Sequence, residues 1–364
     1  MGLIRVFLAL CVLVVHAGFQ PVFPNSQFAV ELFFVISGFY MALVLNTKYL
    51  AGQTLRFYVA RYLRLYPTYI VVLFVVVAFI WPIDNVYSQA PVAFVLTMIS
   101  AFSMVGMEVT HWFGLAVDGS GQIAIISDVN HPGPLSSFAS TYHMQHMWSV
   151  GVEVSFYALA PLFLRRRSTT FAILLLSFGA FVLFGLQLQQ WNPLMVRSAV
   201  GFLWYFAAGG AAYHVYVAMK ERLPHSSGSA WAGLLFLAGA VTIVAIHQSA
   251  KMYLNIPYVV LESVLIPPFA VLMVLAFDAT KNSSFDRTIG ELSYGMYVVH
   301  WPIVSIVLAA HRGDVRYLPL MVIATVLAAS LLHFLIERPV DRYRATLGGN
   351  QIRPSGSKIV REAG

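Results

Sequence analysis

Long runs of apolar residues recur along almost the whole chain. Ten of these runs are close to the length of about 20 residues that lets a helix cross the hydrocarbon core of a bilayer. They cover approximately residues 3–20, 28–46, 65–82, 147–164, 170–188, 198–218, 230–247, 257–277, 290–310 and 317–336. Apolar residues make up 59% of the chain and charged residues only 10%, which is more apolar surface than a soluble domain of this length can bury. We therefore predict an all-α polytopic membrane protein, a bundle of about ten transmembrane helices.

The basic residues predict which side of the membrane each loop faces, because cytoplasmic loops are enriched in Lys and Arg. With the amino terminus in the cytoplasm and ten crossings, 18 of the 22 Lys and Arg residues fall on the inner side. The outer side keeps only Arg197, Lys251, Arg312 and Arg316. An eleventh crossing by a shorter apolar run, 91–105, would break this asymmetry. We therefore predict ten crossings with both termini in the cytoplasm.

The segment 83–146 is then a long loop on the outer, extracytoplasmic side. It has no Lys or Arg, and its Gly and Pro residues disfavour a long helix. Loops of this length in compact proteins are often functional, and we expect 91–105 to form a short helix that lies on the outer face or dips into it. The membrane domain is predicted to cover residues 1–345. The polar, Gly- and Ser-rich tail, 346–364, is predicted to be disordered in the cytoplasm.

Composition excludes several other classes of protein. The net charge of +7 is explained by the inner loops, and no basic stripe alternates with stacking aromatic residues, so no nucleic-acid partner is expected. The single cysteine, Cys11, lies in a predicted span and excludes an internal disulfide framework. His143 and His146 have a spacing that suits a metal, but no third ligand is evident near them, so no metal site is expected. The first apolar run lacks a convincing small-residue cleavage site, and we interpret it as a membrane anchor rather than a signal peptide.

Two ionisable residues, Arg5 and His16, interrupt the first apolar run. They lie on nearly the same helix face, about 16 Å apart along the axis. An ionisable residue inside a membrane helix is costly and is a functional candidate by default. An arginine at a helix end also commonly anchors the helix at the interface, so Arg5 has a plain structural alternative. His16, near the outer end, is the stronger candidate, because an imidazole titrates near neutral pH.

A second motif is RYLRLYP, residues 61–67, at the predicted cytoplasmic mouth of the third helix. Arg61 and Arg64 are three residues apart and therefore neighbours on one helix face. Guanidinium pairs bind phosphoryl oxygens bidentately, so the pair is a candidate phosphate clamp. Ordinary anchoring of a helix by basic residues at the inner face is the alternative.

Two further motifs place polar residues inside predicted spans. Glu153, in MWSVGVEVSFYALAP, lies about two turns into a helix that enters from the outside, where a carboxylate needs a partner. A structural role in holding helices together is its alternative. Tyr294, Tyr297 and His300, in ELSYGMYVVHWP, share one face of a later helix at intervals of three residues. Tyrosines at this spacing are more often packing residues than catalysts, so we interpret this group as pocket lining.

Together these motifs resemble the acyltransferase 3 family of bacterial integral-membrane O-acyltransferases. In that family the arginine and histidine of the first helix are followed by Val-Asp-Leu-Phe-Phe, and here the acid is Glu31. Residues 61–67 resemble its Arg-x-x-Arg followed by proline. The Glu153 motif resembles Trp-Ser-Leu-x-x-Glu-x-x-x-Tyr-x-x-x-Pro, with Val150 in place of leucine. The later motifs resemble Leu-Ser-Tyr-x-x-Tyr-x-x-His-x-Pro and the end of the last span, IERP at 336–339.

The resemblance implies a multi-pass O-acyltransferase of the bacterial cytoplasmic (inner) membrane. Its co-substrate would be acetyl-CoA or another acyl-CoA, and its acceptor a hydroxyl of a glycan, such as an exopolysaccharide or O-antigen, or of another molecule. The expected catalytic residues are His16, Glu31 and Glu153, and the expected CoA-binding residues are Arg5, Arg61 and Arg64. The expected substrate pocket contains Ser37, Trp148, Ser149, Tyr157, Tyr294, Tyr297 and His300. The acceptor and the oligomeric state are left open.

The depths of these residues suggest a mechanism. Acyl-CoA would dock from the cytoplasm with its phosphates on the arginines, and His16 would take the proton of an acceptor hydroxyl from outside. Glu31 or Glu153 would orient the imidazole. Direct transfer is favoured because no Gly-x-Ser-x-Gly nucleophile motif is present, although a covalent intermediate on Ser37 stays open. The alternative function is a transporter or exporter, which the lack of a visible internal repeat disfavours.

Overall fold

A computed structural model describes residues 1–19, 26–80, 91–117, 123–126, 134–137, 144–187, 198–221, 230–311 and 314–347. Its main helices are α1 (Gly2–His16), α2 (Ser26–Thr47), α3 (Thr54–Val75), α4 (Pro91–Ser103), α5 (Trp148–Phe163), α6 (Arg167–Gln187), α8 (Leu203–Met219), α9 (Ala230–Leu254), α10 (Tyr258–Thr280), α11 (Ser284–Ala310), α12 (Leu318–Leu332) and α13 (Arg338–Leu347). A π-helical turn, Val76–Ile80, extends α3, and a second one, η7 (His333–Glu337), joins α12 to α13. Short 3-10 turns are η3 (Val109–His111), η5 (Gln145–Met147) and η6 (Val315–Tyr317).

The predicted helical membrane architecture is confirmed in its main feature. Each of the ten predicted spans coincides with a helix, and in the described part of the chain seven helices are long and apolar enough to cross a membrane. The helices α1, α5 and α8 are shorter, with 15, 16 and 17 residues. Ten crossings with two cytoplasmic termini therefore stay a prediction. The tail that follows Leu347 lies outside the described residues, and so does His143.

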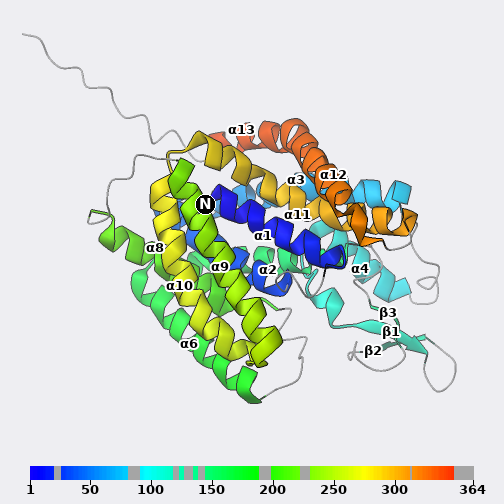
Figure 1. Ribbon diagram of the computed structural model, residues 1–364, viewed down its shortest axis with the longest axis horizontal. Coiled ribbons are helices and arrows are strands. Elements are labelled where there is room, and N and C mark those ends of the chain that lie inside the picture. Colours follow the sequence, from blue (N-terminus) through cyan, green and yellow to red (C-terminus); the bar gives the residue numbers. More distant parts are fainter. Residues whose placement is uncertain are drawn as a thin grey trace, which may run out of the picture.

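Helix α1 lies in the middle of the bundle (Figure 1). One group of helices, α6, α8, α9 and α10, lies on one side of it, and α3, α11, α12 and α13 lie on the other. α1 packs against α2, α9, α11 and α12, so the residues of the first apolar run reach both groups. This central position explains why most of its apolar residues are buried.

Two glycines allow α2 and α8 to pack backbone against backbone. A Cβ atom on Gly209 would lie 1.9 Å from the carbonyl oxygen of Val35, and one on Gly38 would lie 2.0 Å from that of Phe206. Small residues permit such close approach between membrane helices, where van der Waals packing replaces the hydrophobic driving force. The ring of Phe206 stacks on Phe156 of α5 at 3.7 Å, so this contact also holds α5 in place.

Helix α3 begins eleven residues earlier than predicted, at Thr54 instead of residue 65. Its first turns contain Arg56, Arg61 and Arg64 and are not apolar enough for hydropathy to detect. Consequently Arg61 and Arg64 lie two to three turns inside the helix and not at its start. This difference matters for the site, because it places both guanidinium groups within the bundle.

The segment 83–146 contains more structure than the predicted loop and short helix. Three four-residue strands, β1 (Gly114–Val117), β2 (Ile123–Ile126) and β3 (Pro134–Ser137), form an antiparallel sheet in the order β2-β1-β3, with Gly114 paired to Ile126. The predicted short helix is α4, and only one of its faces, with Ala93, Thr97, Ser100 and Ala101, is buried. The hydroxyl of Tyr69, on α3, donates to the carbonyl of Ala101 near the end of α4 at 2.7 Å. The chain then turns back at Met104 and Gly106, which both have positive φ.

Candidate active site

A cavity of about 580 Å³ lies among α1, α2, α3, α5, α11 and α13. Its volume falls within the range of small-molecule and cofactor sites, roughly 300–1,000 Å³. Its polar lining residues are Arg5, Ser37, Tyr40, Lys48, Arg61, Arg64, Ser149, Glu153, Tyr157, Thr280, Lys281, Asp286, Arg287, Glu291, Ser293, Tyr294, Tyr297, Asp341 and Arg344. The structure brings together nine of the residues that the sequence predicts as site residues: Arg5, Ser37, Arg61, Arg64, Ser149, Glu153, Tyr157, Tyr294 and Tyr297.

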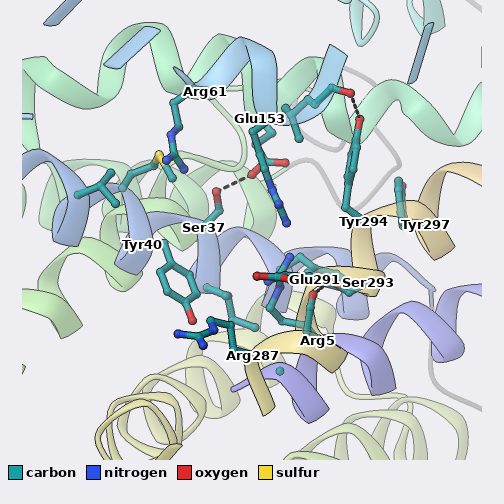
Figure 2. A pocket seen from close by; sticks show the side chains of 18 of the residues that line it. Arg5, Ser37, Tyr40, Arg61, Glu153, Arg287, Glu291, Ser293, Tyr294 and Tyr297 are labelled. Carbon is teal, nitrogen blue, oxygen red and sulfur yellow. Dashed lines mark hydrogen bonds between the residues drawn. The ribbon is translucent and has the colours of Figure 1, made fainter. Parts of the chain in front are cut away.

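Cationic side chains dominate one end of this cavity. We call the end of the bundle at which α1 begins and α2 ends the inner end, because the sequence predicts that it faces the cytoplasm. Arg5 reaches the cavity from α1, whereas Arg61 reaches it from α3 on the opposite wall (Figure 2). Arg64, also on α3, is a further lining residue. Arg64 forms an ion pair with Asp341 of α13 at 3.5 Å. Nε of Arg61 is buried and has no hydrogen-bond partner among the described residues.

Four further cations of the inner end line the cavity and were not predicted as site residues: Lys48, Lys281, Arg287 and Arg344. Arg344 donates from Nε to the carbonyl of Ala60 at 2.9 Å, which fixes α13 against α3. A hydrogen bond to Asp278 raises the pKa of the Lys281 ammonium, which is therefore charged at neutral pH. In the sequence these residues look like ordinary inner-loop charges. Only their number pointed to a site, because the convergence of these separate parts of the chain on one cavity is a property of the fold.

Deeper in the cavity, a carboxylate is held by two hydroxyl groups from different helices. Oε1 of Glu153, on α5, accepts a hydrogen bond from Ser37 of α2 at 2.6 Å (Figure 2). It accepts another from Tyr157 at 2.5 Å. Tyr157 lies four residues after Glu153, on the same face of α5. Glu153 thus has the partners that a buried carboxylate in a membrane protein requires. The arrangement places an acid and a hydroxyl within reach of the arginines.

The outer end of the cavity is formed by Tyr297 and Ser149. On α11, Tyr297 is the lining residue farthest from the inner end, and Ser149 has the same position on α5. Their hydroxyl oxygens lie 2.6 Å apart. The Tyr297 hydroxyl also donates to the carbonyl of His146 at 2.8 Å. Both side chains are buried, so in this conformation they separate the cavity from the residues beyond.

His16 and His300 lie beyond this contact and do not line the cavity. His300 is one helical turn past Tyr297 on α11, and its Nε2 lies 2.9 Å from Nδ1 of His16. His16 faces α11, where it contacts His300 and the edge of Trp301. Among the described residues, the cavity that contains the arginines therefore ends before His16 in this conformation. The predicted catalytic role of His16 requires the contact between Tyr297 and Ser149 to open.

Two other predicted site residues also lie away from the cavity. Glu31 accepts a hydrogen bond from Gln27 at 3.1 Å, and it lies close to Glu262 of α10, not to His16. The expected contact between Glu31 and the His16 imidazole is therefore not formed. Trp148 packs against Phe202, with 5.5 Å between the ring centroids. Neither pairing was visible in the sequence, because the interhelical packing that creates it leaves no local signal.

Comparison with known proteins identifies the class to which this chain is similar. The model of an acyltransferase domain family matches residues 1–334. BcsY of Komagataeibacter xylinus, whose name designates it a membrane-bound transacylase, is 26% identical over 93% of this chain and 81% of its own length. The O-acetyltransferase OatA of Staphylococcus aureus is 24% identical over 93% of this chain. YrhL of Bacillus subtilis, named as a peptidoglycan O-acetyltransferase, is 22% identical over the same share.

The relatives differ in how much of their own length the match covers. The chain spans 56% of OatA and 54% of YrhL, about half of each of these relatives. No solved structure matches the chain. The matched region nevertheless includes all the cavity-lining residues from α1 to α11, whereas the lining residues of α13, Asp341, Arg344 and Ala345, lie beyond it.

Proposed function

The chain belongs to the acyltransferase 3 family and is an acyltransferase, and from this premise we propose that it is a membrane O-acyltransferase that takes an acetyl group from cytoplasmic acetyl-CoA. The acceptor is a hydroxyl of an extracytoplasmic or membrane-associated glycan, and the location is the bacterial inner membrane. The donor, the acceptor and the membrane are parts of the proposal. They are supported by the chemistry of the cavity and by the names of the relatives.

The single observation that carries the proposal is the composition of the cavity along its length. Guanidinium groups of Arg5, Arg61 and Arg64 lie toward the inner end, and the hydroxyl–carboxylate group of Ser37 and Glu153 lies deeper. Coenzyme A carries several phosphates at one end of a long arm and its thioester at the other. Arginine binds phosphate in a bidentate manner, so the nucleotide end of coenzyme A fits the arginines. The arm then directs the thioester toward Glu153.

The transfer itself is an attack of the acceptor hydroxyl on the thioester carbonyl carbon. The carbon–oxygen bond of the new ester forms, the carbon–sulfur bond breaks, and the acceptor proton passes to His16 as the general base. The thiolate of coenzyme A leaves and takes up the proton that His16 accepted, which returns His16 to its neutral form. Because His16 lies beyond Tyr297 and Ser149, the contact between these two residues must open before the acceptor and the thioester can meet.

Incorporation of label from radiolabelled acetyl-CoA into native membranes tests this function. Wild-type protein should transfer label to glycan material, and His16→Ala should insert normally but transfer at least about 100-fold more slowly, since a general base contributes about that much. A His16→Ala variant that transfers at the wild-type rate would show that the base is another residue. Wild-type membranes that transfer no label at all would contradict the proposed reaction.

A further inference from the structure

The arrangement of His16 and His300 has a chemical consequence beyond the proposed function, although it rests on that function for its role. The two imidazole planes are within 4° of parallel, and Nδ1 of His16 lies 2.9 Å from Nε2 of His300. One of these nitrogens must donate a proton to the other. The geometry around His300 decides which one it is.

The second nitrogen of His300 has a fixed partner. Its Nδ1 lies 2.6 Å from the backbone carbonyl oxygen of Tyr297. A carbonyl oxygen only accepts hydrogen bonds, so Nδ1 of His300 carries a hydrogen. The side chain of His300 is 0% exposed, and no carboxylate among the described residues forms an ion pair with it. An uncompensated buried charge is strongly unfavourable, so the ring is neutral and its Nε2 has a free lone pair.

This assignment fixes the tautomer of His16. Because Nε2 of His300 is an acceptor, Nδ1 of His16 is the donor in the 2.9 Å hydrogen bond. A neutral imidazole has one N–H group, so Nε2 of His16 carries the lone pair that a general base needs. A carboxylate usually performs this orienting task behind a catalytic histidine. Here neither Glu31 nor Glu153 bonds to His16.

The other groups near His16 do not compete for its nitrogen atoms. Among the described residues, the other titratable side chains that contact this pair are His146, from η5, and Tyr297. Nε2 of His146 bonds to the carbonyl of Val298 at 3.3 Å, and the Tyr297 hydroxyl bonds to Ser149 and to the carbonyl of His146. Trp301 meets the His16 ring edge-on, with 4.9 Å between ring centroids. His300 is therefore the one described side chain that hydrogen-bonds to His16.

We propose that His300 is a positioning residue for the acyl transfer: its hydrogen bond holds His16 in the tautomer whose Nε2 accepts the proton of the acceptor hydroxyl. The catalytic base is thus supported by a neutral imidazole, which is itself fixed by the backbone of Tyr297. A neutral support orients the base without adding negative charge to a membrane-embedded site. A carboxylate at this position would orient the base and would also add a negative charge.

Three substitutions of His300 in the full-length protein separate orientation from packing. His300→Phe keeps the ring volume and loses the acceptor, so kcat should fall about 100-fold with little change in KM for acetyl-CoA. His300→Gln, whose side-chain carbonyl can accept from Nδ1 of His16, should recover part of kcat. His300→Glu adds a negative charge that favours the protonated imidazole, and should move the acid limb of the pH–rate profile upward by about one pH unit. His214→Phe, a histidine on α8 outside the site, is the control and should keep the wild-type rate.

The readout independent of activity is NMR of isotope-labelled histidine in lipid, with each histidine assigned by substitution. His16 should show a protonated Nδ1 and an unprotonated Nε2 in the wild type, and this preference should be lost in His300→Phe. A protonated Nε2 on His16, or a His300→Phe variant with wild-type kcat while His16→Ala is inactive, would overturn the role of His300 and leave the proposed function intact. A His16→Ala variant with wild-type kcat would instead overturn the assignment of the base. An unmoved acid limb in an active His300→Glu variant would also reject the proposal.

Discussion

The hydroxyl oxygens of Tyr297 and Ser149 lie 2.6 Å apart at the outer end of the cavity, one helical turn before His300. This contact joins α11 to α5 and separates the arginine-lined space from the histidine pair. An enzyme that moves a group between two compartments must keep water away from its thioester until the acceptor arrives. The contact between Tyr297 and Ser149 is at the position where such a barrier is needed.

Removing the Tyr297 hydroxyl should therefore uncouple thioester cleavage from transfer. In Tyr297→Phe the ring stays, but the bonds to Ser149 and to the carbonyl of His146 are lost. We expect hydrolysis of acetyl-CoA without acceptor to rise by up to about tenfold, the equivalent of one lost hydrogen bond, and transfer to membranes to fall. Release of the CoA thiol and incorporation of label measure the two rates. Tyr69→Phe, which removes a buried hydroxyl outside the cavity, is the control, and parallel changes in both rates would contradict the barrier.

The charge of Glu153 should matter more than its hydrogen bonds. Glu153→Gln keeps an oxygen that accepts from Ser37 and Tyr157, so the local packing should survive. We expect kcat to fall about 100-fold while acetyl-CoA still binds, because an acid–base or charge-stabilising group is lost. Glu108→Gln is the matched control, since this buried carboxylate accepts from Ser155 and does not line the cavity. Equal effects of the two substitutions would mean that Glu153 is structural.

Ser37 distinguishes direct transfer from a covalent intermediate. In direct transfer Ser37 only holds Glu153, so Ser37→Ala should keep a rate within about tenfold of wild type, the cost of one hydrogen bond. No label from acetyl-CoA should then remain on denatured wild-type protein. Covalent label that disappears in Ser37→Ala, together with loss of transfer, would establish an acyl-serine instead.

Apolar run length was sufficient to predict the helical membrane architecture, because a bilayer imposes both the length and the composition of each span. Seven helices of the described residues are long and apolar enough to cross a membrane, so ten crossings stay a prediction. Run length failed at the start of α3, where the turns that contain Arg61 and Arg64 are amphipathic and continue the helix outside the apolar run. It also missed the sheet of β1, β2 and β3. Strands of four residues in a Gly- and Pro-rich segment give too short a pattern to detect.

For the site, the motifs on α1, α2, α3, α5 and α11 contain residues that the structure brings to one cavity, but the motifs could not supply the partners of these residues across helices. The neighbours of Glu31 and His16 were therefore assigned wrongly. Glu31 lies close to Glu262 of α10, and His16 bonds to His300 of α11. Arg344 was missed for the same reason, since its position depends on how α13 returns to the bundle after η7.

Close packing of α2 on α8 should make Gly209 intolerant of a methyl group. A Cβ there would lie 1.9 Å from the carbonyl oxygen of Val35, so the helices must move apart. We expect Gly209→Ala to destabilise the protein by about 1–3 kcal/mol, seen as a lower melting temperature in detergent. Gly179→Ala, on α6, has no atom within 4 Å of the new Cβ and should be neutral or slightly stabilising. Equal melting temperatures for the two variants would argue against backbone contact between α2 and α8.

Equilibrium binding of radiolabelled acetyl-CoA to the purified protein in lipid nanodiscs is the most direct test of the central claim, that the arginine-lined cavity holds the donor. Arg61→Gln combined with Arg64→Gln should weaken binding by about 100-fold or more, as expected for the loss of two charge-assisted contacts to phosphate. Arg338→Gln combined with Arg342→Gln removes the same charge from exposed positions of α13 outside the cavity, and should leave the affinity within about twofold. Unchanged affinity in the Arg61 and Arg64 double variant, or equal weakening in both double variants, would contradict the claim.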